Sequence, residues 1–466
     1  MGFVGKLVFI ISSIFVLFSA KVIKDLFDVP PVPQLEERWW GAGSPKESNE
    51  AIVPFKIDIP QKILDDLQLR LKNHRPFVPP LEGVQQHYGM NTGLLSEIVD
   101  FWINKYNWRE REKFLNKFPQ FKTEIQGLNI HFIHVKPSSS LPKNVRVLPI
   151  ILFHGWPGSV REFYDVIPLL TKPQSGRDFV FEVIVPSLPG YGFSDAASKP
   201  GFGPAQMTQI FNKLMNRLGH KKYYIQGGDW GALIVSIMGV LYPENVLGLH
   251  SNACSFVNSA ITRIQLLIGS VFPSLIIEDD HEKSIYPLSE TFSFMLTESG
   301  YLHIQSTKPD TVGVGLNDSP VGLAAYIIEK FSTWTNKNWR DKEDGGLQQK
   351  FTYTDLLDNV MIYWVTGSIT TSVRLYSENF NKQQMSLNLD SIPVTVPAAC
   401  AKFKNELINL PNKVIRSKYV NLVQSNYYND GGHFAAFELP QILANDVWAA
   451  VAKFEEINKG TNTNKT

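Results

Sequence analysis

The hydrophobic pattern changes character at Arg146, where short apolar runs start to alternate with glycine-containing turns and longer amphipathic stretches. "VLPIILF" leads into "HGWPGS", "FVFEVIVPS" into "LPGYGFSD", and "KYYIQ" into "GGDWGA". Such runs are typical of strands buried on both faces, and strands that alternate with helices form mostly parallel sheets. The pattern therefore predicts an α/β fold.

The chain before Arg146 predicts helices and one hairpin. Four apolar residues of "QKILDDLQLRLKN" fall on one helical face: Ile63, Leu64, Leu67 and Leu71. A second helical stretch covers residues 92–117. "FKTEIQGLNIHFIHVK" predicts two strands joined by a Gln126–Gly127 turn.

The strand rhythm is interrupted between residues 256 and 380, where the pattern is mainly helical. "SIPVTVPAAC" and "YVNLVQ" then resume it, and "FAAFELPQILANDVWAAVAKFEEI" predicts a final helix. The simplest organisation is a sheet domain that is split by a helical insertion.

The first 24 residues differ from the rest of the chain. Residues 7–20, "LVFIISSIFVLFSA", are uncharged and lie between Lys6 and Lys21. The run is short for a spanning helix and has the length of a signal-peptide core. Cleavage after Ala20 would need a small residue where Phe18 stands, and both lysines can reach toward the interface to lengthen the span. We therefore favour a retained membrane anchor over a cleaved signal peptide.

Composition excludes several classes of function. The chain of 466 residues has 45 Lys and Arg against 44 Asp and Glu, which gives no basic surface for nucleic acid. Two cysteines, Cys254 and Cys400, exclude a disulfide framework and a cysteine zinc site, and leave open whether the two bond to each other. The histidines show no recurrent ligand spacing, so we expect neither a metal nor a cofactor.

The stretch "IQGGDWGAL" contains the chemistry-bearing motif of the chain. It reads G-x-D-x-G around Asp229, the frame of a nucleophile elbow with aspartate in place of serine. The structural alternative is an Asp that caps the following helix. "HGWPGS" upstream and His433 in "DGGHF" downstream stand where an oxyanion loop and a catalytic histidine belong, which favours the nucleophile.

These segments resemble the microsomal-type epoxide hydrolases, most closely the insect juvenile hormone epoxide hydrolases. The resemblance rests on "RWWG", "RPFVPPLEGV", "HGWPGSVREFY", "PSLPGYGFSDA", "QGGDWGA", "GGHFAAFELP" and a block that begins "ESGYLHIQSTKPDTVGVG". It covers nearly all of the chain after the anchor. It implies an α/β-hydrolase fold with a helical lid and an N-terminal region that wraps the core.

This resemblance suggests a division of the chain into five parts. They are a membrane anchor (1–24), a linker and wrapping region (25–145), the first part of the core (146–255), a helical lid (256–380) and the second part of the core (381–466). The resemblance also favours the endoplasmic reticulum, with a single pass through the lipid bilayer and a cytosolic catalytic body.

The resemblance assigns the remaining site residues. Asp229 is expected to form an ester with a saturated carbon, because a carboxylate can displace a leaving group there. His433 is expected to be the general base that activates water. Glu406 matches the family position that orients the histidine, while Asp430 fits a turn and Asp390 comes too early in the chain.

The resemblance further assigns two lid tyrosines and two backbone donors. Tyr301 and Tyr376 match the proton donors to the epoxide oxygen, and a packed aromatic is the alternative for each. The N–H groups of Trp156 and Trp230 are the expected oxyanion donors. The motif also suggests a cis peptide bond between Trp156 and Pro157.

The expected reaction is hydrolysis of a hydrophobic epoxide to a diol, with a terpenoid hormone as the leading substrate. A haloalkane dehalogenase uses the same Asp-containing elbow and is the enzymatic alternative. A non-catalytic hormone-binding protein on the same fold is the other alternative, because fold does not dictate function.

Overall fold

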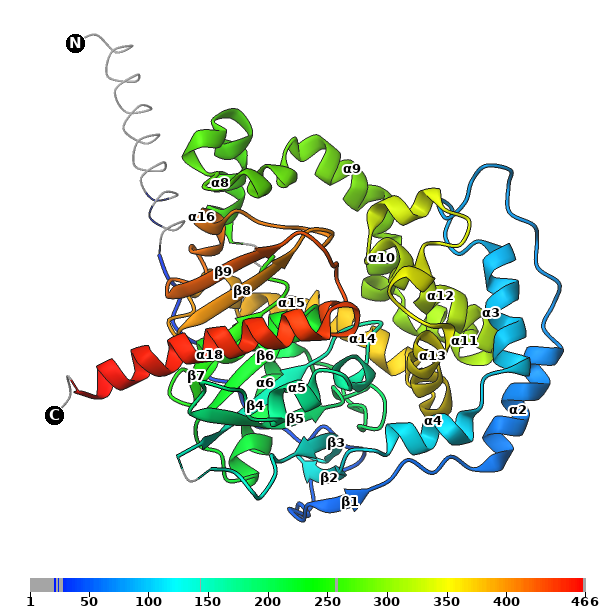
Figure 1. The fold of residues 1–466 in the computed structure, drawn as a ribbon, viewed down its shortest axis with the longest axis horizontal. Coiled ribbons are helices and arrows are strands. Elements are labelled where there is room, and N and C mark those ends of the chain that lie inside the picture. Colours follow the sequence, from blue (N-terminus) through cyan, green and yellow to red (C-terminus); the bar gives the residue numbers. More distant parts are fainter. Residues whose placement is uncertain (1–20, 22–23, 25–27, 143, 256–258, 464–466) are drawn as a thin grey trace, which may run out of the picture.

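The computed structural model describes residues 21, 24, 28–142, 144–255 and 259–463 (Figure 1). The predicted anchor, residues 1–24, lies outside this part except for two of its residues. Among the described residues, no helix combines the length and the apolar character that crossing a membrane requires.

A nine-stranded sheet forms the centre of the molecule, in the order β1-β2-β3-β5-β4-β6-β7-β8-β9. The first three strands pair antiparallel, and β3 pairs antiparallel with β5, whereas the strands from β5 to β9 pair parallel. The strands are Val53–Phe55, Gln120–Ile125, Leu128–Val135, Arg146–Phe153, Phe179–Pro186, Tyr223–Gly227, Val246–Ser251, Ala398–Phe403 and Leu422–Tyr428, β1 to β9 in turn. The predicted mostly parallel sheet is confirmed.

Helices cover both faces of this sheet, so that its central strands are buried. Every residue of β5 is buried, which explains its continuous apolar run. Helices α5 (Ile167–Thr171) and α18 (Pro440–Thr463) pack together (Figure 1). Helices α6 (Pro204–Arg217) and α7 (Trp230–Leu241) form a second pair. The carboxyl ends of the parallel strands remain available for a site.

The N-terminal region adds one hairpin and three helices. The β2–β3 turn has positive φ at Gln126 (51°) and Gly127 (83°), as the hairpin prediction requires. The helices are α2 (Gln61–Lys72), α3 (Thr92–Asn104) and α4 (Trp108–Leu115). The helical stretch predicted over 92–117 is confirmed as two helices, because the chain leaves α3 at Lys105 and Asn107 caps α4 with its side chain.

The segment between β7 and β8 is helical throughout its described regular structure. Its α-helices are α8 (Ala260–Val271), α9 (Leu288–Glu298), α10 (Gly300–Thr307), α11 (Pro309–Asp318), α12 (Pro320–Thr333), α13 (Tyr353–Thr366), α14 (Ile369–Asn379) and α15 (Lys382–Ser386). Helices α10 to α13 lie to one side of the sheet (Figure 1). The insertion therefore starts and ends at adjacent strands, which pair in parallel.

The chain after β8 contains the short helix α16 (Asn412–Ile415), and its C-terminal part differs from the prediction. The single final helix predicted from the sequence is two helices, α17 (Ala435–Glu438) and α18. Pro440 begins α18, and Leu439 before it lies outside the helical region, with φ −140° and ψ 57°. Proline lacks the N–H that would continue α17 and disfavours helical geometry in the residue before it.

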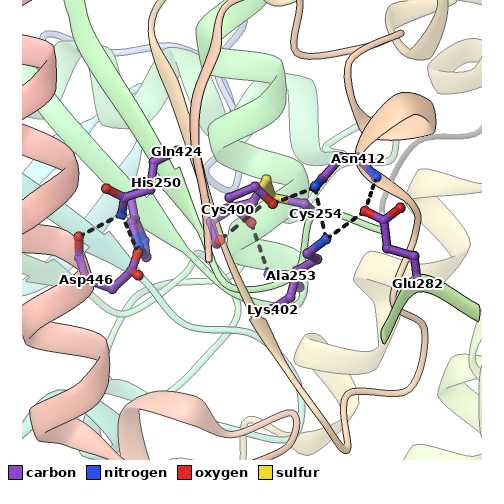
Figure 2. The surroundings of a disulfide bond; sticks show 11 residues. His250, Ala253, Cys254, Glu282, Cys400, Lys402, Asn412, Gln424 and Asp446 are labelled. Carbon is purple, nitrogen blue, oxygen red and sulfur yellow. Dashed lines mark hydrogen bonds and ion pairs between the residues drawn. A yellow bond between two sulfur atoms is a disulfide. The ribbon is translucent and has the colours of Figure 1, made fainter. Parts of the chain in front are cut away.

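A disulfide joins Cys254 to Cys400 across the base of the insertion (Figure 2). Cys254 follows β7 and Cys400 lies within β8, so the bond links the two strands that flank the helical segment. Buried Lys402 lies on one side, where its ammonium donates to Asn412 at 2.9 Å. The buried pair His250–Asp446 lies on the other side, with Nε2 and Oδ1 2.8 Å apart. Sequence pattern alone left this pairing open.

A buried ion cluster connects the N-terminal region, the core and the helical insertion. Asp358 on α13 is completely buried and lies 2.6 Å from Nη2 of Arg111 on α4. Arg161, in the 3₁₀ turn η1 (Val160–Phe163), approaches the same carboxylate at 3.2 Å, and the Tyr106 hydroxyl donates to it at 3.0 Å. The Asp358 carboxylate thus joins two guanidinium groups from separate parts of the chain, and Arg161 also pairs with Asp355 on α13 at 2.6 Å.

We predict that Asp358→Ala lowers the free energy of unfolding by roughly 3–5 kcal/mol, because it leaves the partly buried Arg111 without this carboxylate and removes one of the carboxylates that face buried Arg161. Urea denaturation measures the change. The matched control is Asp310→Ala, which removes an exposed ion pair with Arg374 and should cost only about 0–1 kcal/mol. Equal losses in the two variants would show that the cluster does not hold the three regions together.

Candidate active site

The backbone of Asp229 makes the sharp bend between β6 and α7. Its φ is 51° and its ψ is −127°, a region that residues other than glycine rarely occupy. The Asp229 side chain makes no capping hydrogen bond to α7. The helix-cap alternative is therefore wrong, and the bend instead presents the carboxylate toward the neighbouring loops.

The two glycines of the G-x-D-x-G frame allow this bend. A Cβ at Gly231 would lie 2.2 Å from the carbonyl oxygen of Phe153, and a Cβ at Gly227 would lie 2.4 Å from the carbonyl carbon of Gly231. Helix α7 can therefore begin against β4 only because both residues lack side chains.

Asp229, His433 and Glu406 lie in one hydrogen-bonded row. Nε2 of His433 is 3.1 Å from Asp229 Oδ2, and Nδ1 is 2.8 Å from Glu406 Oε1. The three residues follow the carboxyl ends of β6, β8 and β9, which neighbour one another through β7. The side chains of His433 and Glu406 are 5% and 4% exposed, and that of Asp229 is 17% exposed. The structure thus brings the predicted nucleophile, base and orienting acid together.

The charges in this row fix the state of the histidine. Burial alone would lower the pKa of His433, but the adjacent Glu406 and Asp229 carboxylates outweigh it and raise the pKa well above the ordinary value. The imidazole is therefore cationic while both neighbours are ionised. Loss of either negative charge would lower the pKa of His433 and so favour the neutral imidazole that a general base requires.

The other two carboxylates considered for the orienting role lie elsewhere. Asp430 binds Lys350 at 2.7 Å and accepts the N–H of Gly431 within its own turn, also at 2.7 Å. Asp390 lies in a 3₁₀ turn where its charge interacts with Lys418. Neither contacts the imidazole, which leaves Glu406 as its partner.

The loop after β4 supplies a backbone donor. The N–H of Trp156 donates to Asp229 Oδ1 at 2.8 Å. A Cβ at Gly155 would lie 2.2 Å from that oxygen, so a side chain there would displace the carboxylate. The Trp156–Pro157 peptide bond is cis, as expected. The second predicted donor, the N–H of Trp230, stands at the start of α7 but makes no hydrogen bond to Asp229 in the described structure.

His154 supports this loop. Its Nδ1 donates to the carbonyl of Gly155 at 2.9 Å, and its Nε2 accepts from the N–H of Leu188 at 3.1 Å. Burial lowers the pKa of His154 to about 4, so the ring stays neutral. Both ring nitrogens are thus engaged in holding the backbone, and neither is free to act as a base.

The two predicted tyrosines come from different helices of the insertion and face the same loops. Tyr301 on α10 stacks on the indole of Trp156, with centroids 5.5 Å apart and planes 7° apart. Tyr376 on α14 packs edge-on against Trp230 with centroids 4.7 Å apart. The two phenol rings are 6.0 Å apart. Tyr301 and Tyr376 therefore belong to one aromatic cluster that also contains Trp156 and Trp230, the residues beside the elbow.

Both phenols are protonated at neutral pH. Burial raises the pKa of Tyr301 and Tyr376, and the Asp229 carboxylate raises it further in each case. A protonated phenol can donate a hydrogen bond, so the two tyrosines are suited to stabilise an alkoxide that develops beside the elbow.

Two buried glutamates near the row were missed by the sequence reasoning. Glu438 accepts the N–H groups of Gly432 and Phe434 at 2.8 and 2.9 Å, and so holds the turn that carries His433. Glu162 lies beside Asp229 in the cavity under the loop. Burial raises the pKa of both glutamates to about 8. Each is an acidic residue in an apolar stretch close to a recognised motif, which is the signal that could have found it.

Two groups of side chains among the described residues have the spacing of metal ligands, and neither contains a predicted site residue. One is His134, Glu182 and His220, and the other is Asp279, His281 and Glu282.

Comparisons with known proteins agree with this geometry. A family model for the epoxide hydrolase N terminus matches residues 52–163, and one for the alpha/beta hydrolase fold matches residues 149–438. Juvenile hormone epoxide hydrolase 1 of Ctenocephalides felis is 54% identical over 96% of this chain and 94% of its own length. Epoxide hydrolase 1 of Sus scrofa is 48% identical over 89% of this chain and 92% of its own length.

A solved structure shows the same architecture. The crystal structure of juvenile hormone epoxide hydrolase from the silkworm Bombyx mori has a TM-score of 0.88 and 50% sequence identity, and the match covers 91% of this chain and 99% of that one. With the fold, the row of Asp229, His433 and Glu406 and these relatives in agreement, the chain belongs to the epoxide hydrolase family of α/β-hydrolase enzymes.

Proposed function

We propose that the enzyme converts a hydrophobic epoxide, with juvenile hormone or a related terpenoid epoxide as substrate, to a diol through a covalent ester on Asp229. The observation that carries this proposal is the Asp229 carboxylate itself. One oxygen accepts the Trp156 N–H, and the other faces His433. A carboxylate held in this way has one oxygen for bonding to carbon and one that remains in an oxyanion site.

The proposed substrate class is supported by the aromatic cluster beside the elbow and by the names of the relatives. Aromatic rings of Trp156, Trp230, Trp334, Tyr301 and Tyr376 contact one another around the elbow. Such a surface favours an apolar ligand that offers few polar groups. Relatives from a flea and from the silkworm carry the name juvenile hormone epoxide hydrolase.

In the first half-reaction, Asp229 Oδ2 attacks a ring carbon of the epoxide. A bond forms between Oδ2 and that carbon while the carbon–oxygen bond of the strained ring breaks. Tyr301 or Tyr376 donates its proton to the leaving oxygen, which becomes a hydroxyl group, and the phenolate regains a proton as the His433 cation gives up its own. The paired phenols favour epoxide opening over halide displacement, because a halide leaves without needing a proton.

In the second half-reaction, water hydrolyses the ester. Esterification removes the negative charge of Asp229, and this lowers the pKa of His433 toward the neutral form that a general base needs. Glu406 keeps Nδ1 protonated, so Nε2 faces the water. The Trp156 N–H stabilises the oxyanion, a contribution typically worth about 3 kcal/mol.

We also propose that residues 1–24 anchor the enzyme in the endoplasmic reticulum membrane as a single pass, with the catalytic body in the cytosol. The apolar run between Lys6 and Lys21 supports the anchor, and an apolar substrate partitions into the same lipid. The Cys254–Cys400 disulfide argues for the opposite side, because cytosolic glutathione keeps thiols reduced.

The first prediction concerns the nucleophile. In a single turnover with excess enzyme in heavy-oxygen water, we expect the first diol to carry unlabelled oxygen from Asp229, and label to enter the protein. Mass spectrometry of the diol and of the peptide that contains Asp229 measures both. Label that passes directly into the first diol would exclude the ester route.

The second prediction concerns the proton donors. Tyr301→Phe and Tyr376→Phe should each slow ester formation by about 10²-fold, because each removes a donor to the leaving oxygen. Tyr326→Phe is the matched control. Its ring also packs on Trp156, at 5.7 Å, but its hydroxyl accepts from Gln305. Stopped-flow tryptophan fluorescence follows the step, and equal rates in all three variants would remove the tyrosines from the mechanism.

The third prediction concerns the compartment. A cytosolic body requires the sequons at Asn317 and Asn464 to lack glycans and requires Cys254 and Cys400 to be free thiols in cells. Deglycosylation shifts and thiol alkylation before lysis test these two points. Glycans on either sequon, or thiols protected as the disulfide, would place the catalytic body in the lumen.

A further inference from the structure

We infer that Glu162 holds the water that hydrolyses the Asp229 ester. This inference rests on the proposed covalent route and assigns a residue to its second step. It starts from a small cavity beside the carboxylate, lined by Asp229, His433, Glu162 and the backbone of Gly155 and Gly158, among others.

The cavity has the size of one water molecule. Its volume is about 20 Å³, and roughly 10–15 Å³ of such space suffices for one water with polar partners. Phe153, Phe163 and Phe434 close its apolar sides. The polar side chains of the wall are Asp229, His433 and Glu162, together with His154 and Asn252. The first three are the partners that a reacting water needs.

The chain gives the Glu162 carboxyl group a specific place. Glu162 lies in the η1 turn directly after the Trp156 loop, and it is 9% exposed. A Cβ at Gly158 would lie 1.6 Å from Glu162 Oε1. The carboxyl head therefore rests on the bare backbone of Gly158, and that glycine leaves the space through which Glu162 reaches the cavity.

The surrounding charges make Glu162 responsive to the chemistry at Asp229. Burial raises the pKa of Glu162 to about 8, His433 acts in the opposite direction, and the charges of Asp229 and Glu438 raise it further. Tyr363 is a further titratable group nearby, and the charge of Glu162 raises the pKa of its phenol. Formation of the ester removes the Asp229 charge, but the accompanying loss of the His433 cation acts in the opposite direction and is the larger influence, so the pKa of Glu162 stays raised and its carboxyl group is mostly neutral at pH 7.

The step can be written with Glu162 as a water-positioning residue. The water donates one hydrogen to neutral His433 Nε2 and the other to a carboxyl oxygen of Glu162, which turns its lone pair toward Cγ of Asp229. The new bond joins the water oxygen to Cγ, and the bond from Cγ to the substrate oxygen breaks. His433 takes the proton of the water and passes it to the departing oxygen, while Glu162 ends the step unchanged.

The test separates ester formation from ester decay. Wild type, Glu162→Gln and Glu162→Leu are mixed in excess with an aromatic epoxide, quenched over time, and the alkylated Asp229 peptide is measured by mass spectrometry. We expect formation within about 2-fold of wild type, and decay slowed about 10-fold in Glu162→Gln and about 10²-fold in Glu162→Leu. The control is Glu112→Gln, a buried glutamate that serves the N-terminal region by accepting from Ile59 and Trp108.

Each outcome has a defined meaning. Decay at the wild-type rate in both Glu162 variants, or equal slowing of formation and decay, would overturn the inference, since the second result indicates a structural role. If Glu162→Leu does not fold, the isosteric Glu162→Gln decides. The pH profile of decay adds a readout, because Glu162→Gln should lose one of the ionisations that raise the wild-type rate with pH. Absence of any alkylated Asp229 in the wild type would instead contradict the proposed function.

Discussion

The left-handed backbone at Asp229 is the constraint on which the rest of the site depends. A residue with a side chain held at positive φ costs on the order of 1–3 kcal/mol, so the surrounding structure must enforce it. The close approaches at Gly227 and Gly231 do so from one side, and the hydrogen bond from Trp156 does so from the other. A relaxed backbone at Asp229 would bring its carboxylate over the N-terminus of α7, where it would cap the helix and lose its contact with His433.

The position of that carboxylate then determines the electrostatics. Glu406, His433 and Asp229 form an anion–cation–anion sequence in which the two outer groups raise the pKa of the central one. The arrangement is stable while Asp229 is ionised and changes when that charge is lost. Chemistry at Asp229 thus alters the acid–base state of the site without any movement of the backbone, because the coupling acts through charge.

Local pattern was sufficient for the parts of the molecule that depend on neighbours in sequence. The strands around β5 are continuous apolar runs, and the bend at Asp229 follows from glycines next to it in the chain. The break before Pro440 also had a local signal, which the single predicted helix ignored. Chain order placed His433, but the family resemblance was needed to choose Glu406, Tyr301 and Tyr376.

The features that pattern could not supply join residues far apart in sequence. Arg111 and Asp358 are separated by 247 positions, and Cys254 and Cys400 by 146. Pairing at such distances depends on how helices and strands pack, and a charge or a thiol in the sequence carries no record of its partner. The limits of the five proposed chain segments remain a prediction for the same reason.

The two glutamates with raised pKa values show how one site can hold several carboxyl groups in different roles. Glu438 accepts two backbone N–H groups, which favour its ionised form and fix it to the His433 turn. Glu162 lines a cavity shared with Asp229 and His433, so the charges of both residues act on its pKa. Environment thus gives residues of identical chemistry different roles: Glu438 holds the His433 turn, Glu162 faces the water cavity, and Glu406 orients the imidazole. Because a carboxyl oxygen accepts a hydrogen from water in either protonation state, Glu162 holds the water without depending on the loss of the Asp229 charge.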